Sequence, residues 1–270
     1  MAQPRCLSSA FQPDRDELID LLGRLVAART ENPPGNETAA AIVAADYFTR
    51  CGIPFGTHEF APGRANVVAR VGAGKPELLI AAHLDVVPPG DGWDTDPFRL
   101  EVKGDWLIGR GVSDNKGPLA CLLLAARFLH EYVPLKGTVL AAAVADEERG
   151  SGVGLERLLD ERVIAPDVAL IPDVAGLHGI IDVAEKGVLF VEIVTHGRQA
   201  HGSRPELGVN AAAVLVDFLH RLRQRPVPIA THPLFTPTTM NLGSIHGGAA
   251  PNMVPARCTA SGSPRPMAWP

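Results

Sequence analysis

Three apolar runs of this chain each end in imidazole or carboxylate side chains, and this feature constrains the fold more than any other. LLIAAHLDVV carries His83 and Asp85, TVLAAAVAD leads to the adjacent pair Glu147 and Glu148, and VALIPD ends at Asp173. Continuous rather than alternating apolar runs are typical of strands buried on both faces, and helical segments such as GPLACLLLAARFL separate them. The sequence therefore predicts an α/β fold with a mainly parallel sheet covered by helices.

The pattern changes near residue 178. EKGVLFVEIVTHG alternates in the manner of a half-exposed strand, ELGVNAAAVLVDFLHRLRQ is periodic like a helix, and TTMNLGSIHGG is typical of another strand. One-sided strands with a single helix indicate a smaller α+β domain. We therefore expect two domains, over residues 1–178 and 179–270.

Two helices are expected ahead of the apolar strands. Apolar residues recur at helical spacing after Asp16, until the stop at Asn32-Pro33-Pro34. Asn36 is suited to cap a second helix over TAAAIVAADYFTR, and Gly52 to end it.

Composition argues against several classes of function. The chain has 25 basic and 30 acidic residues with no long run of either sign, so it carries no electrostatic footprint for nucleic acid or an anionic membrane. No apolar run is long enough to span a bilayer and the N-terminus lacks a secretory h-region, so we expect a cytoplasmic protein. No strand ends in a GxGxxG or GxxxxGK[ST] motif, which argues against nucleotide binding. The scattered cysteines lack CxxC spacing, which favours free thiols: Cys6, Cys51, Cys121 and Cys258.

The first motifs suggest metal chemistry, although each also has a simpler interpretation. His83 and Asp85 are two apart on a predicted strand, so both side chains share a face and Asp85 can restrain an imidazole that binds metal. The alternative is a surface histidine beside an aspartate in a turn. Asp114 lies in a Gly-rich turn before a helix, where it could bridge two metal ions or simply cap the helix.

The adjacent glutamates are more informative. Neighbouring residues at a strand end point in different directions, so one of Glu147 and Glu148 can bind metal while the other acts as a general base. The alternative is a solvated acidic turn, and Asp173 could likewise merely begin a turn. The occurrence of all these motifs in order along one chain favours the metal site.

Together the motifs resemble the two-zinc amidohydrolases and exopeptidases, a family that includes aminoacylase, acetylornithine deacetylase, succinyl-diaminopimelate desuccinylase, glutamate carboxypeptidase and several dipeptidases. AAHLDVVPPGDGWDTDPF, GRGVSDNKGPLA and ADEERGSG are similar to its three signature regions in order and spacing. GRQAHGSRPELGVNAA and GGAAPNMVP are similar to its lid domain, so the resemblance runs from about residue 15 to about residue 260.

The resemblance implies a catalytic domain over 1–178, an incomplete lid or dimerisation domain over 179–270, and two zinc ions, with cobalt or manganese as possible substitutes. Its implied metal ligands are His83, Asp114, Glu148 and Asp173. Asp114 would bridge the ions, Glu147 would be the general base, and Asp85 would orient His83.

In the lid, the resemblance implies a homodimer in which His201 reaches the partner's site and stabilises the oxyanion. Asn252 resembles a lid residue that contacts substrate, and Arg204 is placed with it in the substrate-binding set. The expected substrate is a small molecule with a free carboxylate.

The resemblance breaks near the C-terminus. Family members continue beyond the length of this chain, and that part supplies a histidine to the second zinc; His220, His232 and His246 all lie in lid-like sequence and are not convincing substitutes. The ending GSPRPMAWP is Pro-rich and predicts no strand. We therefore hypothesise a frameshift or premature stop, with weaker binding of the second zinc and an unpaired edge in the lid.

Two functions remain open at this level. The first is a zinc-dependent hydrolase of an amide or peptide bond: Asp173 and DNKGP favour a dipeptidase, whereas QAHGSRPELGVNAA favours an N-acyl amino-acid deacylase. The second is a metal-binding or dimerising remnant without turnover.

Overall fold

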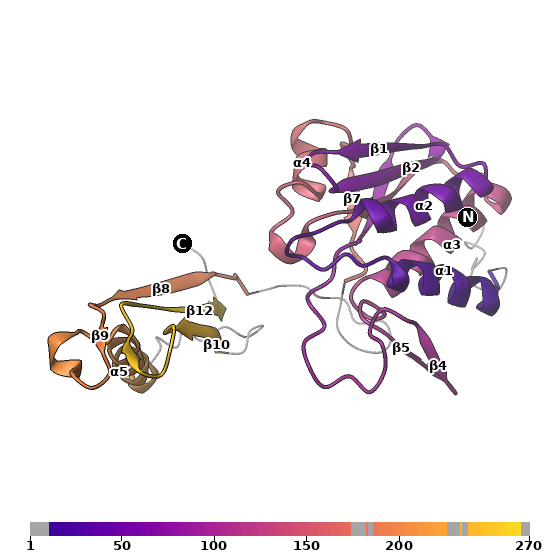
Figure 1. The fold of residues 1–270 in the computed structure, drawn as a ribbon. Helices are drawn as coiled ribbons and strands as arrows, with labels where there is room; N and C mark the ends of the chain where they lie inside the picture. The colour runs from indigo at the N-terminus through magenta and orange to yellow at the C-terminus, as the bar shows by residue number, and fades with distance from the viewer. Residues whose placement is uncertain (1–10, 174–181, 183–185, 226–232, 234–236, 266–270) are drawn as a thin grey trace. The chain divides into compact units, whose positions relative to one another are not determined.

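The structure, a computed structural model, describes residues 11–173, 182, 186–225, 233 and 237–265 (Figure 1). The chain folds into two compact units, Met1–Leu177 and His178–Pro270. This division lies one residue from the boundary expected from the sequence, and each unit is described by itself below. Within the described ranges, no helix has the length and apolar character needed to cross a membrane.

The first unit is built on a five-stranded sheet in the order β1-β2-β6-β3-β7. Its strands are β1 (Phe55–Glu59), β2 (Ala65–Ala73), β3 (Glu77–His83), β6 (Gly137–Val144) and β7 (Val168–Leu170). β3 pairs in parallel with β6 and β7, whereas β1–β2 and β2–β6 are antiparallel. The α/β class is confirmed, and the sheet is mixed. β2 is antiparallel to both of its neighbours, yet its first five residues are all buried, so burial on both faces does not require parallel pairing.

Helices cover both faces of this sheet. On one face lie α1 (Arg15–Ala27), α2 (Thr38–Arg50) and α3 (Lys116–Tyr132), whose apolar sides share one core cluster with Val67, Ala69, Ala141 and Ala143. On the other face, α4 (Leu155–Asp160) inserts Leu158 into a second cluster with Leu140, Ala142 and Val144. The alternation of β6 residues between the clusters explains why all eight positions of this strand are buried. A small hairpin of β4 (Glu101–Lys103) and β5 (Trp106–Ile108) lies between β3 and α3 along the chain.

The ends of α2 differ in how well the sequence predicts them. The helix ends as expected: Gly52 has a φ of 67° and donates to Thr49, and Ile53 donates to Phe48, which together satisfy the last carbonyls. The expectation that Asn36 caps the start is wrong, because the N-cap position is Glu37 and no side chain caps it.

Strand β7 is more exposed than its sequence predicts. VALIPD indicates a buried strand, yet Val168 is 60% and Leu170 54% exposed. β7 stands last in the sheet order and pairs only with β3 among the described strands. Apolar character therefore does not reveal burial here, since burial depends on what covers the edge of the sheet.

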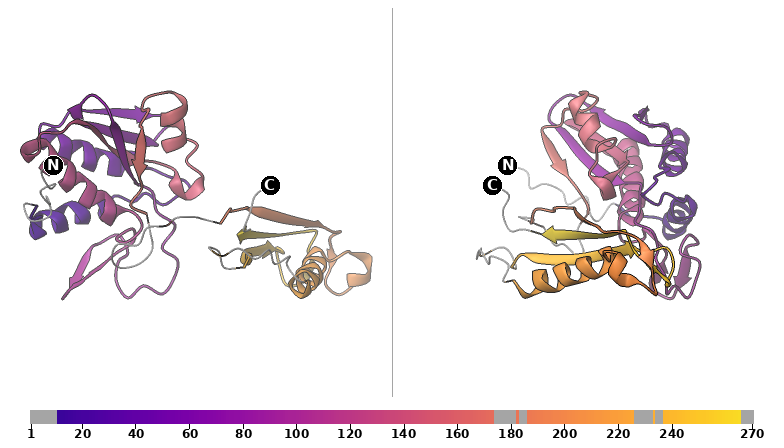
Figure 2. Two further views of the ribbon diagram at one scale, coloured as in Figure 1. Left: turned by 180° about the vertical axis from the view of Figure 1, so that it is seen from behind. Right: turned by 60° about the vertical axis from the view of Figure 1, so that its left-hand side comes forward.

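The second unit is a three-stranded antiparallel sheet with one helix on its face (Figure 2). The sheet order is β10 (Thr239–Gly247), β12 (Arg257–Arg265) and β8 (Val191–His196), and the helix is α5 (Ala211–Gln224). β9 (Ala200–His201) pairs with β11 (Met253–Val254) in a separate ladder. α5 packs through a buried apolar stripe against the middle of β12, and the residues of this small core are Ala211, Leu215, Leu219, Cys258 and Ala260.

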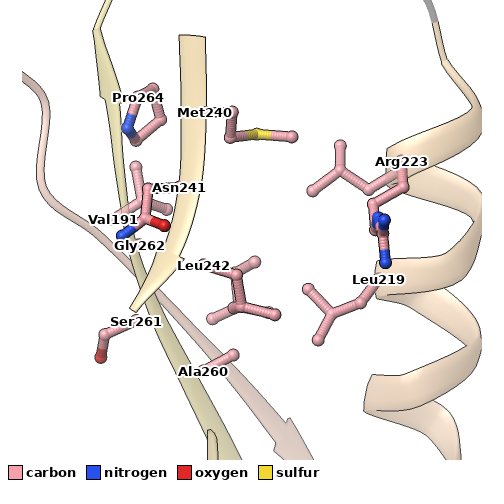
Figure 3. Close-up of a pocket in the computed structure, with 12 residues that line it drawn as sticks. Val191, Leu219, Arg223, Met240, Asn241, Leu242, Ala260, Ser261, Gly262 and Pro264 are labelled. Carbon is pink, nitrogen blue, oxygen red and sulfur yellow. The ribbon is translucent and has the colours of Figure 1, made fainter. Parts of the chain in front are cut away.

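A pocket opens between α5 and the end of the sheet, where Leu219 and Arg223 face Met240 and Leu242 (Figure 3). Pro264 also lines this pocket, at a position where the sequence predicts no strand. That prediction is wrong for residues 262–265: β12 continues to Arg265, with Pro264 opposite Met240. The rest of the ending, residues 266–270, lies outside the described residues. Pro264 cannot donate to the ladder, but its carbonyl accepts the N–H of Leu189, so the strand continues.

Adjacent leucines of α4 test the second core cluster. Leu158 is fully buried and Leu159 is 42% exposed. We expect Leu158→Ala to lower the free energy of unfolding of the first unit by about 2–5 kcal/mol, because it leaves a cavity, and Leu159→Ala to lower it by less than about 1 kcal/mol. Urea denaturation of both variants measures the difference, and equal losses would contradict this packing.

Candidate metal centre

Strand ends bring the predicted site residues of the first unit together. His83 is the last residue of β3, Glu147 and Glu148 begin the turn after β6, and Asp173 follows β7. These three strands are parallel, so their carboxyl ends lie at one edge of the sheet. Asp114 reaches the same edge from the turn immediately before α3.

His83 lies at the centre of the cluster. Its Nε2 atom is 2.8 Å from Asp114 Oδ1, 3.7 Å from Asp173 Oδ2 and 3.9 Å from Glu147 Oε2. Two groups of possible ligand atoms each fit within 4.8 Å: His83 with Asp114 and Asp173, and His83 with Glu147 and Glu148. The geometry thus brings the three predicted carboxylate ligands and the predicted base within 4.8 Å of the imidazole of His83, the fourth predicted ligand.

The orientation of the His83 ring directs Nε2 at the predicted metal site. Its Nδ1 atom lies 2.9 Å from the carbonyl oxygen of Asp85 and 3.5 Å from the Asp85 carboxylate. An Nδ1–H that donates to the carbonyl leaves Nε2 facing the carboxylates, where it donates to Asp114 when protonated and can bind a metal once deprotonated. Asp85 thus restrains the ring, but through its main chain at least as closely as through its side chain.

The buried Asp85 carboxylate also accepts hydrogen bonds that the sequence does not predict. It accepts the backbone N–H groups of Glu147 and Glu148, each at 3.1 Å, and the Asn32 side-chain amide at 2.8 Å. Asn32 also donates to Asp146 at 3.1 Å. These bonds fix the turn that carries both glutamates. Sequence reasoning treats Asn32 only as part of a helix stop, and no local pattern reveals that its partners lie 53 and 114 positions away.

Charge accumulates at this edge of the sheet. Burial opposes the charged form of His83, yet hydrogen bonds and negative charge from Asp114 and Asp85 outweigh it and raise the imidazole pKa to about 10. Burial, followed by the charge of Asp114, raises the pKa of Glu148 to about 7, and burial also raises that of Glu147. The hydrogen bond from His83 lowers the pKa of Asp114. One imidazole cannot neutralise so many carboxylates, and a divalent cation is suited to do so.

Another contact missed by sequence reasoning joins α3 to the end of β7. Asn115 donates its side-chain amide to the Pro172 carbonyl at 3.1 Å. This bond ties the turn of Asp114 to the segment of Asp173, which aligns two of the predicted ligands. The residue next to a predicted ligand is a reasonable place to look for such support, but its partner is 57 positions away.

The remaining predicted residues lie together in the second unit. β9 and β11 pair His201 with Met253, next to Asn252, whose carbonyl accepts the N–H of Gly202 at 2.7 Å. Arg204 follows three positions after His201 and donates its N–H to the His201 carbonyl at 2.9 Å. All three predicted side chains are exposed. His232, considered as a ligand, lies outside the described residues.

Comparisons with known proteins agree with this architecture. Residues 66–158 match the profile described as Peptidase family M28, and residues 183–267 match the profile described as Peptidase dimerisation domain. The M20 family metallo-carboxypeptidase of Sulfolobus solfataricus has a TM-score of 0.72 at 22% identity, over 94% of this chain and 71% of that one. Human carnosine dipeptidase 1 has a TM-score of 0.69 at 20% identity, over 93% and 70% of the two chains.

Relatives found by sequence have a higher identity to this chain than these two solved structures have. The chain is 31% identical to the succinyl-diaminopimelate desuccinylase of Gluconacetobacter diazotrophicus over 94% of its own length and 68% of the relative's. It is 32% identical to the acetylornithine deacetylase of Vibrio cholerae, over 86% of its own length and 62% of the relative's. The chain thus shares its fold with solved metallopeptidases, and its sequence relatives are named as amidohydrolases. The chain belongs to the M20 family. It spans 54% of the desuccinylase of Gluconobacter oxydans and 64% of that of Rhizorhabdus wittichii.

Binding of a divalent metal is expected to tighten as pH rises. If His83 and Glu148 are ligands as predicted, a metal displaces a proton from His83 (pKa about 10) and from Glu148 (pKa about 7). Affinity should therefore rise about a hundredfold per pH unit below about pH 7, where both protons are displaced, and about tenfold per unit above it. Calorimetry in buffers of different ionisation enthalpy counts the released protons. Glu148→Gln should reduce the lower slope to about tenfold, and an affinity independent of pH would contradict this electrostatic account.

Proposed function

We propose that this site belongs to a zinc-dependent hydrolase that cleaves an amide or peptide bond of an N-acyl amino acid or small peptide. The observation that carries the proposal is the convergence on His83 of two groups of carboxylates, one from Asp114 and Asp173 and one from Glu147 and Glu148. Imidazole and carboxylate donors suit zinc, with cobalt or manganese as substitutes. The relatives named as desuccinylase and deacetylase support the choice of bond.

The proposed ligands of the first ion are one of these two groups, whereas those of the second ion follow the family resemblance. His83, Asp114 and Asp173 would hold one ion, and Asp114 and Glu148 the other, with Asp114 as the bridge. When bound, a pair of divalent ions lowers the pKa of a shared water and polarises the scissile carbonyl. Asp85 keeps the His83 ring oriented throughout.

Glu147 is the proposed general base. It accepts the proton of the attacking water and returns it to the departing amine as the C–N bond breaks. Burial raises its pKa, which favours this exchange because the carboxylate holds the proton more readily than an exposed glutamate does. In the second unit, His201 is the proposed oxyanion donor, and Arg204 and Asn252 are the proposed contacts to a substrate carboxylate.

Relatives favour a deacylase over a dipeptidase. The relatives at 31–33% identity that are named above are three desuccinylases and a deacetylase, whereas the neighbours named as carboxypeptidase or dipeptidase are 20–22% identical. We therefore place an N-acyl amino acid with a free carboxylate first among substrates. Asp173 and the DNKGP motif keep the dipeptidase as the second choice.

A non-catalytic remnant is the alternative function. One observation favours it: within the part of the chain that the structure describes, both ligand groups share His83, and neither contains a second imidazole. The second ion of the proposed pair would therefore be held by carboxylates alone. Tight binding of a single ion without hydrolysis would support the remnant.

Glu147→Gln tests the general base. Hydrolysis of N-succinyl and N-acetyl amino acids, and of dipeptides, should fall by roughly 10²–10⁴-fold, because the attacking water loses its proton acceptor. Zinc stoichiometry should stay unchanged, and the exposed Glu156→Gln on α4 serves as the control. Hydrolysis that survives Glu147→Gln would contradict the assignment.

We further propose that the second unit forms a homodimer. The matched profile over residues 183–267 is that of a dimerisation domain, and α5 exposes Val214 and Phe218, each at 47%. These side chains are one helical turn apart and so share a face of α5.

Charge on this face of α5 should separate the subunits. Val214→Glu with Phe218→Glu is expected to weaken the dimer by roughly tenfold or more, because association would bury the carboxylates. Sedimentation of the variant over a range of concentrations measures the shift. Ile42→Glu, at an exposed apolar position of α2, should leave the dimer intact.

A further inference from the structure

Asp146, the residue before the glutamate pair, adopts an unusual backbone conformation. Its φ is 65°, in the left-handed region that non-glycine residues rarely occupy. Its N–H donates to Glu37 Oε1 at 3.2 Å, and its carboxylate accepts from the side chains of Asn32 and Arg64 and from the N–H of Val153. Side-chain contacts therefore hold this conformation in place at the point where the chain leaves β6.

Arg64 joins the two acids of this network. Its guanidinium binds both carboxylate oxygens of Glu37, and Nη2 also donates to Asp146 Oδ1 at 2.8 Å. The Glu37 side chain is fully buried and that of Arg64 is 16% exposed. Only the planar fork of arginine can engage one carboxylate with two groups and reach a second at the same time.

The chain leaves room for this guanidinium at Gly35. A Cβ added there would collide with Nε of Arg64, and the φ of Gly35 is +81°. A glycine at position 35 therefore both permits the positive φ of the turn and leaves space for the Arg64 side chain. The network extends from Gly35 and Glu37, ahead of α2, to the turn after β6.

We propose that Arg64 is a positioning residue for the glutamate pair. By bridging Glu37 and Asp146 it fixes the backbone from which Glu147 and Glu148 depart. In this backbone conformation the N–H groups of both glutamates donate to the Asp85 carboxylate. The proposal rests on the roles proposed above for Glu147 as base and Glu148 as ligand.

Positioning of the turn by Arg64 is distinct from a contribution to the stability of the first unit. A buried ion pair gains little net stability over an apolar core, since desolvation offsets the attraction between the charges. A polar network that fixes one backbone conformation is instead useful for precision at the neighbouring site. Arg64 should therefore matter more for the turn than for the unit as a whole.

Amide hydrogen exchange tests the proposal without requiring catalysis. In Arg64→Gln, peptides that cover residues 145–153 should exchange roughly tenfold faster or more, while those of α3 keep the wild-type rate. Arg64→Lys should behave in the same way, because an ammonium keeps the charge but cannot bridge both acids. Arg70→Gln is the matched control: Arg70 lies on the adjoining β2 and makes an exposed ion pair with Glu77.

Loss of one buried charge could unfold the unit, so two further changes are needed. Glu37→Gln with Arg64→Gln leaves no unpaired charge between these two positions, and should still accelerate exchange in the turn. Gly35→Ala should do so by displacing the guanidinium. Gly74→Ala is its control, because Gly74 also has a positive φ, +86°, but nothing lies within 4 Å of its Cβ position.

Zinc titration gives the second readout. Arg64→Gln should weaken the binding of zinc by roughly tenfold while Arg70→Gln leaves it unchanged, as Glu148 loses its fixed position. The proposal is overturned if folded Glu37→Gln/Arg64→Gln and Gly35→Ala both exchange the amides of residues 145–153 at the wild-type rate. If the wild-type chain binds no zinc, the proposed function fails, but accelerated exchange in the turn would still support Arg64 as the residue that positions it.

Discussion

The Asp85 carboxylate is the interaction on which the rest of the site depends. It lies just beyond β3, is fully buried, and accepts the N–H groups of Glu147 and Glu148 beyond β6. A buried anion of this kind is tolerated only when donors surround it, and here the donors are the backbone of the functional turn itself. Parallel pairing of β3 and β6 places donor and acceptor opposite each other, so the register of the sheet sets the geometry of the site.

Around that anion the first unit has two polar layers. The inner layer, Asn32, Glu37, Arg64 and Asp146, is buried or nearly so and internally hydrogen-bonded. The outer layer is His83 with its carboxylates, where negative charge exceeds positive charge and the pKa values of His83 and Glu148 are raised. The first layer is satisfied by protein groups alone, whereas the second has the charge and the donor types that a divalent metal takes.

Sequence reasoning predicts the parts of this arrangement that follow from local patterns. Apolar runs identify the strands, and residues just beyond the parallel strands must meet at one edge, so His83, Glu147, Glu148 and Asp173 could be grouped without a structure. The exposure of β7 could not be predicted, because it depends on the order of strands. Nor could the continuation of β12 through Pro264, which relies on the carbonyl rather than the missing N–H.

Contacts between residues distant in sequence also could not be predicted. Arg64 reads as an ordinary basic residue ahead of a strand, and its contact with Asp146 spans 82 positions. The catalytic, metal-binding and substrate-binding roles of the individual residues remain predictions.

The span of these contacts has a consequence for folding. The Asn32–Asp146 and His83–Asp114 bonds join positions 114 and 31 residues apart, so the cluster has no local precursor in the unfolded chain. Bringing together residues this far apart costs the entropy of closing the intervening loops. The ability to hold an ion is therefore a property of the completed first unit alone. An ion that binds there favours the native state by mass action, and metal supply in the cell becomes one determinant of how much folded protein persists.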